Sequence, residues 1–160
     1  MDDHNYSRVG RWAQLVFRGA ASAAAVLACA QPVLAGGFLQ GNYSLLAAHR
    51  NAAMILAGAI LLSLLAAVLM WRPGRGPGSL PALCGVTLLL CGGQIGLGFA
   101  RVLIIHIPLG IAVLALVVWI AVIGWRTPLP GRSAPAASET AAPEAAVAET
   151  AVYEAVGVEA

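Results

Sequence analysis

Four long apolar stretches dominate this sequence and leave few folds open to it. They run over about residues 18–39, 45–71, 80–99 and 103–125, with short polar stretches between them. Each approaches or exceeds the roughly 20 residues that an α-helix needs to cross the hydrocarbon core of a bilayer. The pattern predicts an all-α fold, an integral membrane antiparallel four-helix bundle.

Composition supports the assignment to the membrane class. Hydrophobic residues make up 60% of the 160 residues and charged residues only 10%, whereas soluble domains carry about 25% charged residues. All nine cations are arginine, and they lie at the ends of the apolar stretches rather than along one face. A nucleic-acid-binding surface is therefore excluded, and we expect the lipid bilayer to be the main partner.

The flanks of the apolar region differ from it in composition. Residues 1–11 are polar and predict a cytoplasmic N-terminus, which leaves 12–127 as the transmembrane domain. Residues 128–160 consist mostly of Ala, Pro, Ser, Thr and Glu. Such a segment cannot bury enough apolar surface to offset its ordering entropy, so we predict a disordered cytoplasmic tail. As an alternative, the first apolar stretch resembles a secretory signal, whose removal would leave three spans.

The placement of the arginines predicts the orientation of the spans. If the spans alternate in direction, seven arginines fall on one side of the membrane and only Arg50 and Arg101 on the other. By the positive-inside rule, the first side is cytoplasmic and holds both termini. This orientation suits a multi-pass protein of a bacterial plasma membrane. The seven are Arg8, Arg11, Arg18, Arg72, Arg75, Arg126 and Arg132.

Two histidines are the residues of greatest functional interest. His49 and His106 each lie about one helical turn inside the start of an apolar stretch, the second and the fourth. Alternating spans place both imidazoles at the same depth under the outer face. An ionisable side chain in lipid is costly, which makes the pair a functional-site hypothesis. Two facing imidazoles in a helical bundle are suited to ligate a metal as the axial ligands of a haem, and we expect haem b.

Small and basic residues near the histidines are consistent with this hypothesis. Ala53 and Gly110 lie one turn below the two histidines, where a flat macrocycle has to approach the helix backbone. Arg50 and Arg101 lie at the same outer boundary, and guanidinium is the preferred partner of carboxylates such as the haem propionates. Alternatively, these two arginines only anchor helix ends by reaching to the headgroups.

Gln94 is the intramembrane polar residue closest to this pattern, and it lies in the glycine-rich run 92–98. Its side chain is suited to bond an imidazole Nδ1 and orient the ring, or to join neighbouring helices as polar residues do in membranes. Gln31 precedes His49 much as Gln94 precedes His106. This weak repeat predicts a tandem two-helix unit that supplies one ligand from each half.

These residues support a resemblance to a known family. His49-Arg50, together with Gln94-x-Gly-Leu-Gly-Phe-Ala-Arg before His106, resembles one four-helix half of the haem A synthase family. It is also similar to small four-span membrane proteins of actinobacteria. The similarity covers roughly residues 25–120 and implies that a haem is held between the two histidines. Leu46 stands where the family has a glutamate, and the external cysteine pair and the second half are absent. The resemblance therefore implies haem ligation and not oxidation of a haem methyl group.

Two main functions remain open. The first is a membrane haem protein for electron transfer or haem handling, with a membrane redox protein or a second copy of itself as partner. The second is a structural or accessory membrane protein without a cofactor, in which the histidines hydrogen-bond across helices. A transporter is a weaker third, since no acidic residue lies inside any span. No hydrolase, kinase or nucleotide-binding motif is present, and no catalytic residue is predicted.

Overall fold

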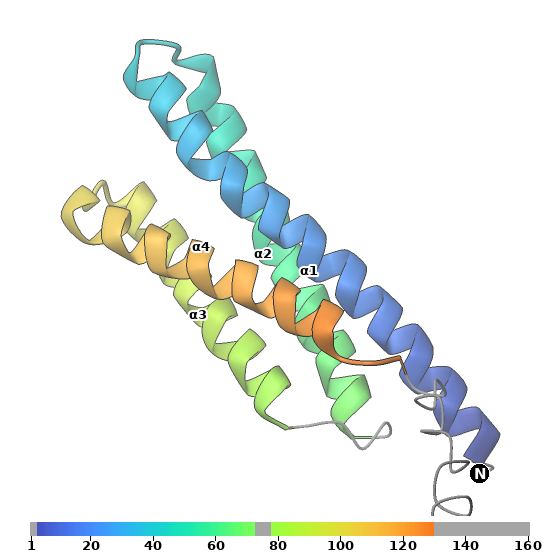
Figure 1. Cartoon of the computed structure of the whole chain (residues 1–160). Coiled ribbons are helices and arrows are strands. Elements are labelled where there is room, and N and C mark those ends of the chain that lie inside the picture. Colours follow the sequence, from blue (N-terminus) through green and yellow to red (C-terminus); the bar gives the residue numbers. More distant parts are fainter. Residues whose placement is uncertain (1–2, 73–77, 130–160) are drawn as a thin grey trace, which may run out of the picture. The chain divides into compact units, whose positions relative to one another are not determined.

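The computed structural model describes residues 3–72 and 78–129, which form four α-helices and no strand in these two ranges (Figure 1). The four helices are α1 (Asp3–Leu39), α2 (Ser44–Trp71), α3 (Ser79–Phe99) and α4 (Leu103–Arg126). The all-α prediction is confirmed, and each helix is long and apolar enough to cross a membrane. The tail that we predicted to be disordered, residues 128–160, lies outside the described residues from residue 130 onward.

Helix bounds agree closely with the sequence prediction for α2, α3 and α4, and differ for α1. The predicted span began near residue 18, whereas the helix begins at Asp3 and continues through Pro32. The reason lies in packing, because Ala13 and Phe17 precede the apolar stretch and are nevertheless buried in a cluster with Met70 of α2. Contacts with a neighbouring helix extend α1 beyond the segment that hydropathy alone identifies.

The four helices pack side by side in a ring, in the same order in which they follow one another along the chain. Helix α1 contacts α2 and α4, and α3 contacts the same two helices. Consecutive helices run antiparallel, so the α1–α2 and α3–α4 connections lie at the same end, away from the beginning of α1 (Figure 1). This up-and-down arrangement is common among helical bundles with short connections. It brings the starts of α2 and α4, and with them both histidines, to one end of the bundle.

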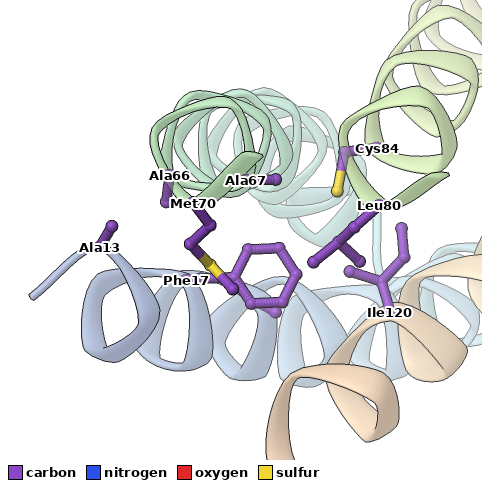
Figure 2. Close-up of a cluster of buried hydrophobic side chains, with 9 residues drawn as sticks. Ala13, Phe17, Ala66, Ala67, Met70, Leu80, Cys84 and Ile120 are labelled. Carbon is purple, nitrogen blue, oxygen red and sulfur yellow. The ribbon is translucent and has the colours of Figure 1, made fainter. Parts of the chain in front are cut away.

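Two clusters of buried side chains fill the interior. In the first, Phe17 is fully buried and points between α2, α3 and α4, with Met70, Leu80 and Ile120 close by (Figure 2). A Cβ at Gly124 would lie only 2.7 Å from the Phe17 ring, so any larger residue at this position of α4 would force the buried ring to shift. The second cluster lies nearer the histidines and consists of Ala24, Ala28, Leu56, Ile60, Cys91, Val113 and Val117.

A polar network joins α1 to the end of α4. Arg18 donates from Nε to the main-chain oxygen of Gly124 at 3.0 Å and from Nη2 to that of Thr127 at 2.7 Å. Gln14 donates to the same Thr127 oxygen at 2.6 Å, and the Arg18 guanidinium lies 5.0 Å from the centroid of the Trp125 ring. The last carbonyls of a helix lack intrahelical donors and favour a nearby cation. Arg18 therefore fixes α4 against α1 at the end opposite the histidines.

Candidate functional site

The α1–α2 and α3–α4 connections share one backbone motif. Both α1 and α3 end in a Schellman turn, in which an N–H beyond the helix end returns to a carbonyl five residues earlier. In the first connection Asn42 donates to Gly37 at 3.2 Å, and in the second Val102 donates to Leu97 at 3.0 Å. The two hairpins therefore reverse direction in the same way.

The residue at the centre of each turn adopts a left-handed conformation. It is Gly41 in the first turn, with a φ of 96°, and Arg101 in the second, with a φ of 58°. Glycine adopts this region freely, whereas a residue with a Cβ loses roughly 1–2 kcal/mol there. Arg101 is exposed, so no burial of its side chain offsets this cost.

The shared turn explains why a glutamine stands opposite each histidine. In the sequence, residue 40 lies midway between Gln31 and His49, and residue 100 lies midway between Gln94 and His106. Residues equally far from the turn of an antiparallel hairpin lie beside each other on neighbouring helices. The first pair is 18 residues apart along the chain and the second pair 12. His49 therefore lies farther from the turn of its hairpin than His106 lies from the turn of the other hairpin.

Each histidine ring is hydrogen-bonded to the main chain of that glutamine. His49 Nδ1 lies 3.3 Å from the Gln31 oxygen, and His106 Nδ1 lies 3.0 Å from the Gln94 oxygen. A carbonyl oxygen can only accept, so Nδ1 carries the proton in both rings and donates it. In a neutral imidazole this leaves Nε2 with a free lone pair. Histidines that ligate metals are usually held in this way.

The two rings lie close to each other. Their centroids are 6.4 Å apart, with 58° between the ring planes, and both side chains are partly buried. Two imidazoles that bind one metal from opposite sides, each at about 2 Å, have centroids roughly 6 Å apart. A tetrahedral pair would be closer, at roughly 5 Å by the same bond lengths. The observed separation suits opposed ligands.

Within the described residues, the site offers two candidate metal ligands, His49 and His106. Within residues 3–72 and 78–129, no three His, Cys, Asp or Glu residues come together in a way that could hold a metal ion. A bare ion bound by two imidazoles would lack most of its coordination shell. Haem brings four ligands of its own and takes the remaining two from the protein, so the donor set fits haem better than a bare metal.

Gln94 has a more specific role than the sequence suggested. Its main-chain oxygen, and not its side chain, accepts from the His106 ring, while its side-chain Nε2 donates to the main-chain oxygen of His106 at 2.7 Å. A Cβ at Gly110 would lie 2.7 Å from this Nε2 atom. The space beside Gly110, where we expected the macrocycle to approach, is therefore taken by the Gln94 amide.

The remaining predicted residues lie at the same end of the bundle. Arg50 is exposed, and its guanidinium lies 5.4 Å from the centroid of the Phe99 ring, which brings α2 into contact with the end of α3. Arg101 lies in the α3–α4 connection, and Ala53 is partly buried one turn beyond His49. No acidic residue occurs anywhere between Asp3 and Glu139 of the sequence. The two arginines thus have no carboxylate near them in the helical region.

In comparisons with known proteins, no protein-family model, curated protein or solved structure matches the chain.

Two contacts at the site were not predicted, although the sequence had drawn attention to Gln31 and to the glycine-rich run 92–98. Gln31 accepts from the His49 ring through its main chain, a role that any residue type can fill. Gly98 packs against the His106 ring, where a Cβ would lie 3.0 Å from the ring carbon Cε1. The signal that could have located Gln31 is positional, since each glutamine and its histidine lie symmetrically about a helix end.

Proposed function

We propose that this chain is a multi-pass protein of a bacterial plasma membrane that binds b-type haem between His49 and His106, for electron transfer or haem handling. One observation carries the proposal. Both rings donate from Nδ1 to a main-chain oxygen, which leaves both Nε2 lone pairs free, and the ring centroids are 6.4 Å apart. Proteins hold haem with this kind of ligand pair.

Two arginines, Arg50 and Arg101, have a part in the proposed haem binding besides the two histidines. His49 and His106 would hold the iron, and Arg50 and Arg101 would receive the propionates at the outer end of the site. Because no acidic residue occurs between Asp3 and Glu139 of the sequence, the propionates would be the carboxylate partners that these two cations lack in that range. Bound haem would supply one-electron chemistry, and the chain's own residues would hold and orient it.

Entry of a haem requires movement at the histidine end of the bundle. A cavity of about 320 Å³ lies at the other end and is lined by Met70, Ser79, Leu80, Leu83, Ile123 and Thr127. It includes neither histidine. Because the Gln94 amide occupies the space beside Gly110, we infer that the helices near the histidines would have to move apart to admit a haem.

The orientation of the helices supports an outer location for this site. Of the arginines in the described residues, two lie at the histidine end, Arg50 and Arg101, and five lie toward the other end: Arg8, Arg11, Arg18, Arg72 and Arg126. The positive-inside rule then places the histidines near the outer face and both termini in the cytoplasm. A membrane-impermeant maleimide added to intact cells should label an N42C variant in the α1–α2 connection. Failure to label this variant would contradict the proposed orientation and favour the opposite one.

The haem assignment is tested by spectra of the detergent-purified protein with added hemin. Reduction with dithionite should produce a sharp α-band, as a six-coordinate low-spin haem does. The double variant His49→Ala/His106→Ala should show no such band under the same conditions. An unchanged wild-type spectrum would favour the second candidate, a structural membrane protein. That candidate has support of its own, because the same Nδ1 bonds tie α2 to α1 and α4 to α3.

A further inference from the structure

The cavity at the end of the bundle opposite the histidines is apolar inside and polar at the helix ends. Its volume of about 320 Å³ falls within the range of about 300–1,000 Å³ that is usual for small-molecule sites. Met70 and Leu80 line its interior, where both belong to the buried cluster around Phe17 (Figure 2). Its mouth lies between Ser79, at the start of α3, and Thr127, just beyond the end of α4. Such a cavity suits an amphiphile whose apolar part lies inside and whose polar part lies at the mouth.

Exposed arginines flank both sides of this mouth. On the α4 side, Arg126 directly precedes Thr127 and is exposed. On the α3 side, the Trp71 ring packs against the start of α3, since a Cβ at Gly78 would lie 2.9 Å from the Nε1 atom of that ring. The guanidinium of Arg72, which is also exposed, lies 4.8 Å from the centroid of the same ring. The mouth therefore has a guanidinium group on each side.

The helices that form the cavity do not balance this positive charge. No aspartate or glutamate occurs in α2, α3 or α4. Guanidinium groups bind phosphate through paired hydrogen bonds, and basic pockets between transmembrane helices on the cytoplasmic side recognise anionic lipid headgroups. Because all four helices are long and apolar enough to cross a membrane, lipid is the amphiphile that surrounds them. An anionic phospholipid matches the cavity in charge and in polarity.

We propose that the cavity holds an acyl chain of an anionic phospholipid, whose phosphate is bound by Arg72 and Arg126 at the mouth. Helices α2 and α4 are not neighbours in the ring, whereas both line the cavity together with α3. The lipid therefore links three helices at this end. A ligand that binds only the folded chain stabilises it, so the lipid strengthens the end of the bundle opposite the histidines. This site depends neither on the histidines nor on haem.

Matched arginine variants test the binding of the headgroup. Full-length, haem-free protein in neutral detergent is titrated with phosphatidylglycerol or with phosphatidylcholine of the same chains, and bound lipid is counted by native mass spectrometry. Wild type should retain one phosphatidylglycerol in preference to phosphatidylcholine. Arg72→Gln/Arg126→Gln should weaken this binding about tenfold, whereas Arg50→Gln/Arg101→Gln, with the same loss of charge at the other end, should not. Equal losses in the two variants, or equal binding of the two lipids, would overturn the proposal.

A second comparison tests whether the acyl chain occupies the cavity. Leu83 lines the cavity, and Leu89 on the same helix is exposed. Leu83→Trp should fill the space and abolish the preference for phosphatidylglycerol, whereas Leu89→Trp should retain it. Retention in both variants would overturn the proposal.

A measurement on the wild type covers the case in which Leu83→Trp does not fold. Phosphatidylglycerol should raise the temperature of thermal unfolding, whereas glycerol 3-phosphate, which carries the charge without an acyl chain, should not. Equal stabilisation by the two compounds would show that the cavity plays no part in binding.

Discussion

Gln94 and His106 are joined by hydrogen bonds in both directions, with the His106 ring donating to the main chain of Gln94 at 3.0 Å and the Gln94 side chain donating to the main chain of His106 at 2.7 Å. The pair connects α3 to α4 near the end of the bundle that carries both histidines. Because the ring and the backbone of His106 are both fixed, its Nε2 atom is positioned before any ligand binds. Such preorganisation lowers the ordering cost of binding.

Adding a methyl group beside this pair should reveal how tightly the ring is packed. In Gly98→Ala the new Cβ would lie 3.0 Å from His106 Cε1, and overpacking of this kind costs about 1–3 kcal/mol. Gly96→Ala, two residues away on the same helix, meets no atom within 4 Å and should gain up to about 1 kcal/mol from helix propensity. Thermal unfolding in detergent should therefore shift in opposite directions for the two variants. A Gly98→Ala variant as stable as Gly96→Ala would contradict the packing.

The contact between Gly110 and the Gln94 amide predicts energetic coupling between α4 and α3. Gly110→Ala should displace the amide, whose Nε2 would lie 2.7 Å from the new Cβ, and lose its bond to His106, worth about 1 kcal/mol. In a Gln94→Ala background the same substitution has nothing to displace and should be neutral or stabilising. A double-mutant cycle measured by unfolding should give a coupling of about 1 kcal/mol, and strict additivity would refute the contact.

Hydropathy was enough to locate α2, α3 and α4, because their apolar stretches end at polar or glycine-rich connections. It failed at the start of α1, where the helix is stabilised by contacts of Ala13 and Phe17 with another helix. A window of single-residue hydropathies contains no information about such contacts. Long-range packing overrides local composition at this point.

The proximity of His49 and His106 was predictable from the sequence, whereas the hydrogen bonds of their rings were not. Opposed spans place His49 and His106 at one depth, and the structure brings their rings to 6.4 Å. The hydrogen bonds that fix the rings use main-chain oxygens of Gln31 and Gln94. Every residue carries such an oxygen, so the sequence does not indicate which one accepts until the register of each hairpin is known.

The network at the end of α4 predicts a large effect from an arginine far from the histidines. Arg18→Ala removes two bonds to the main-chain oxygens of Gly124 and Thr127. Hydrogen bonds from charged groups are worth about 1.5–3 kcal/mol each, and partial exposure reduces the total, so we expect a loss of about 2 kcal/mol. Arg11→Ala, an exposed arginine on the same helix, should change stability by less than about 0.5 kcal/mol. Chemical or thermal unfolding in detergent measures both, and equal effects would argue against the network.

The left-handed backbone at Arg101 allows stability and function to be separated. Glycine relieves the strain at a φ of 58°, so Arg101→Gly should raise the stability of the haem-free protein by up to about 1 kcal/mol. If the guanidinium binds a haem propionate, the same variant should lower hemin affinity several-fold, as measured by titration. Gly41→Ala, at a φ of 96° in the equivalent turn, should destabilise the protein through its backbone. An Arg101→Gly variant with higher stability and unchanged hemin affinity would leave only the helix-end role for this arginine.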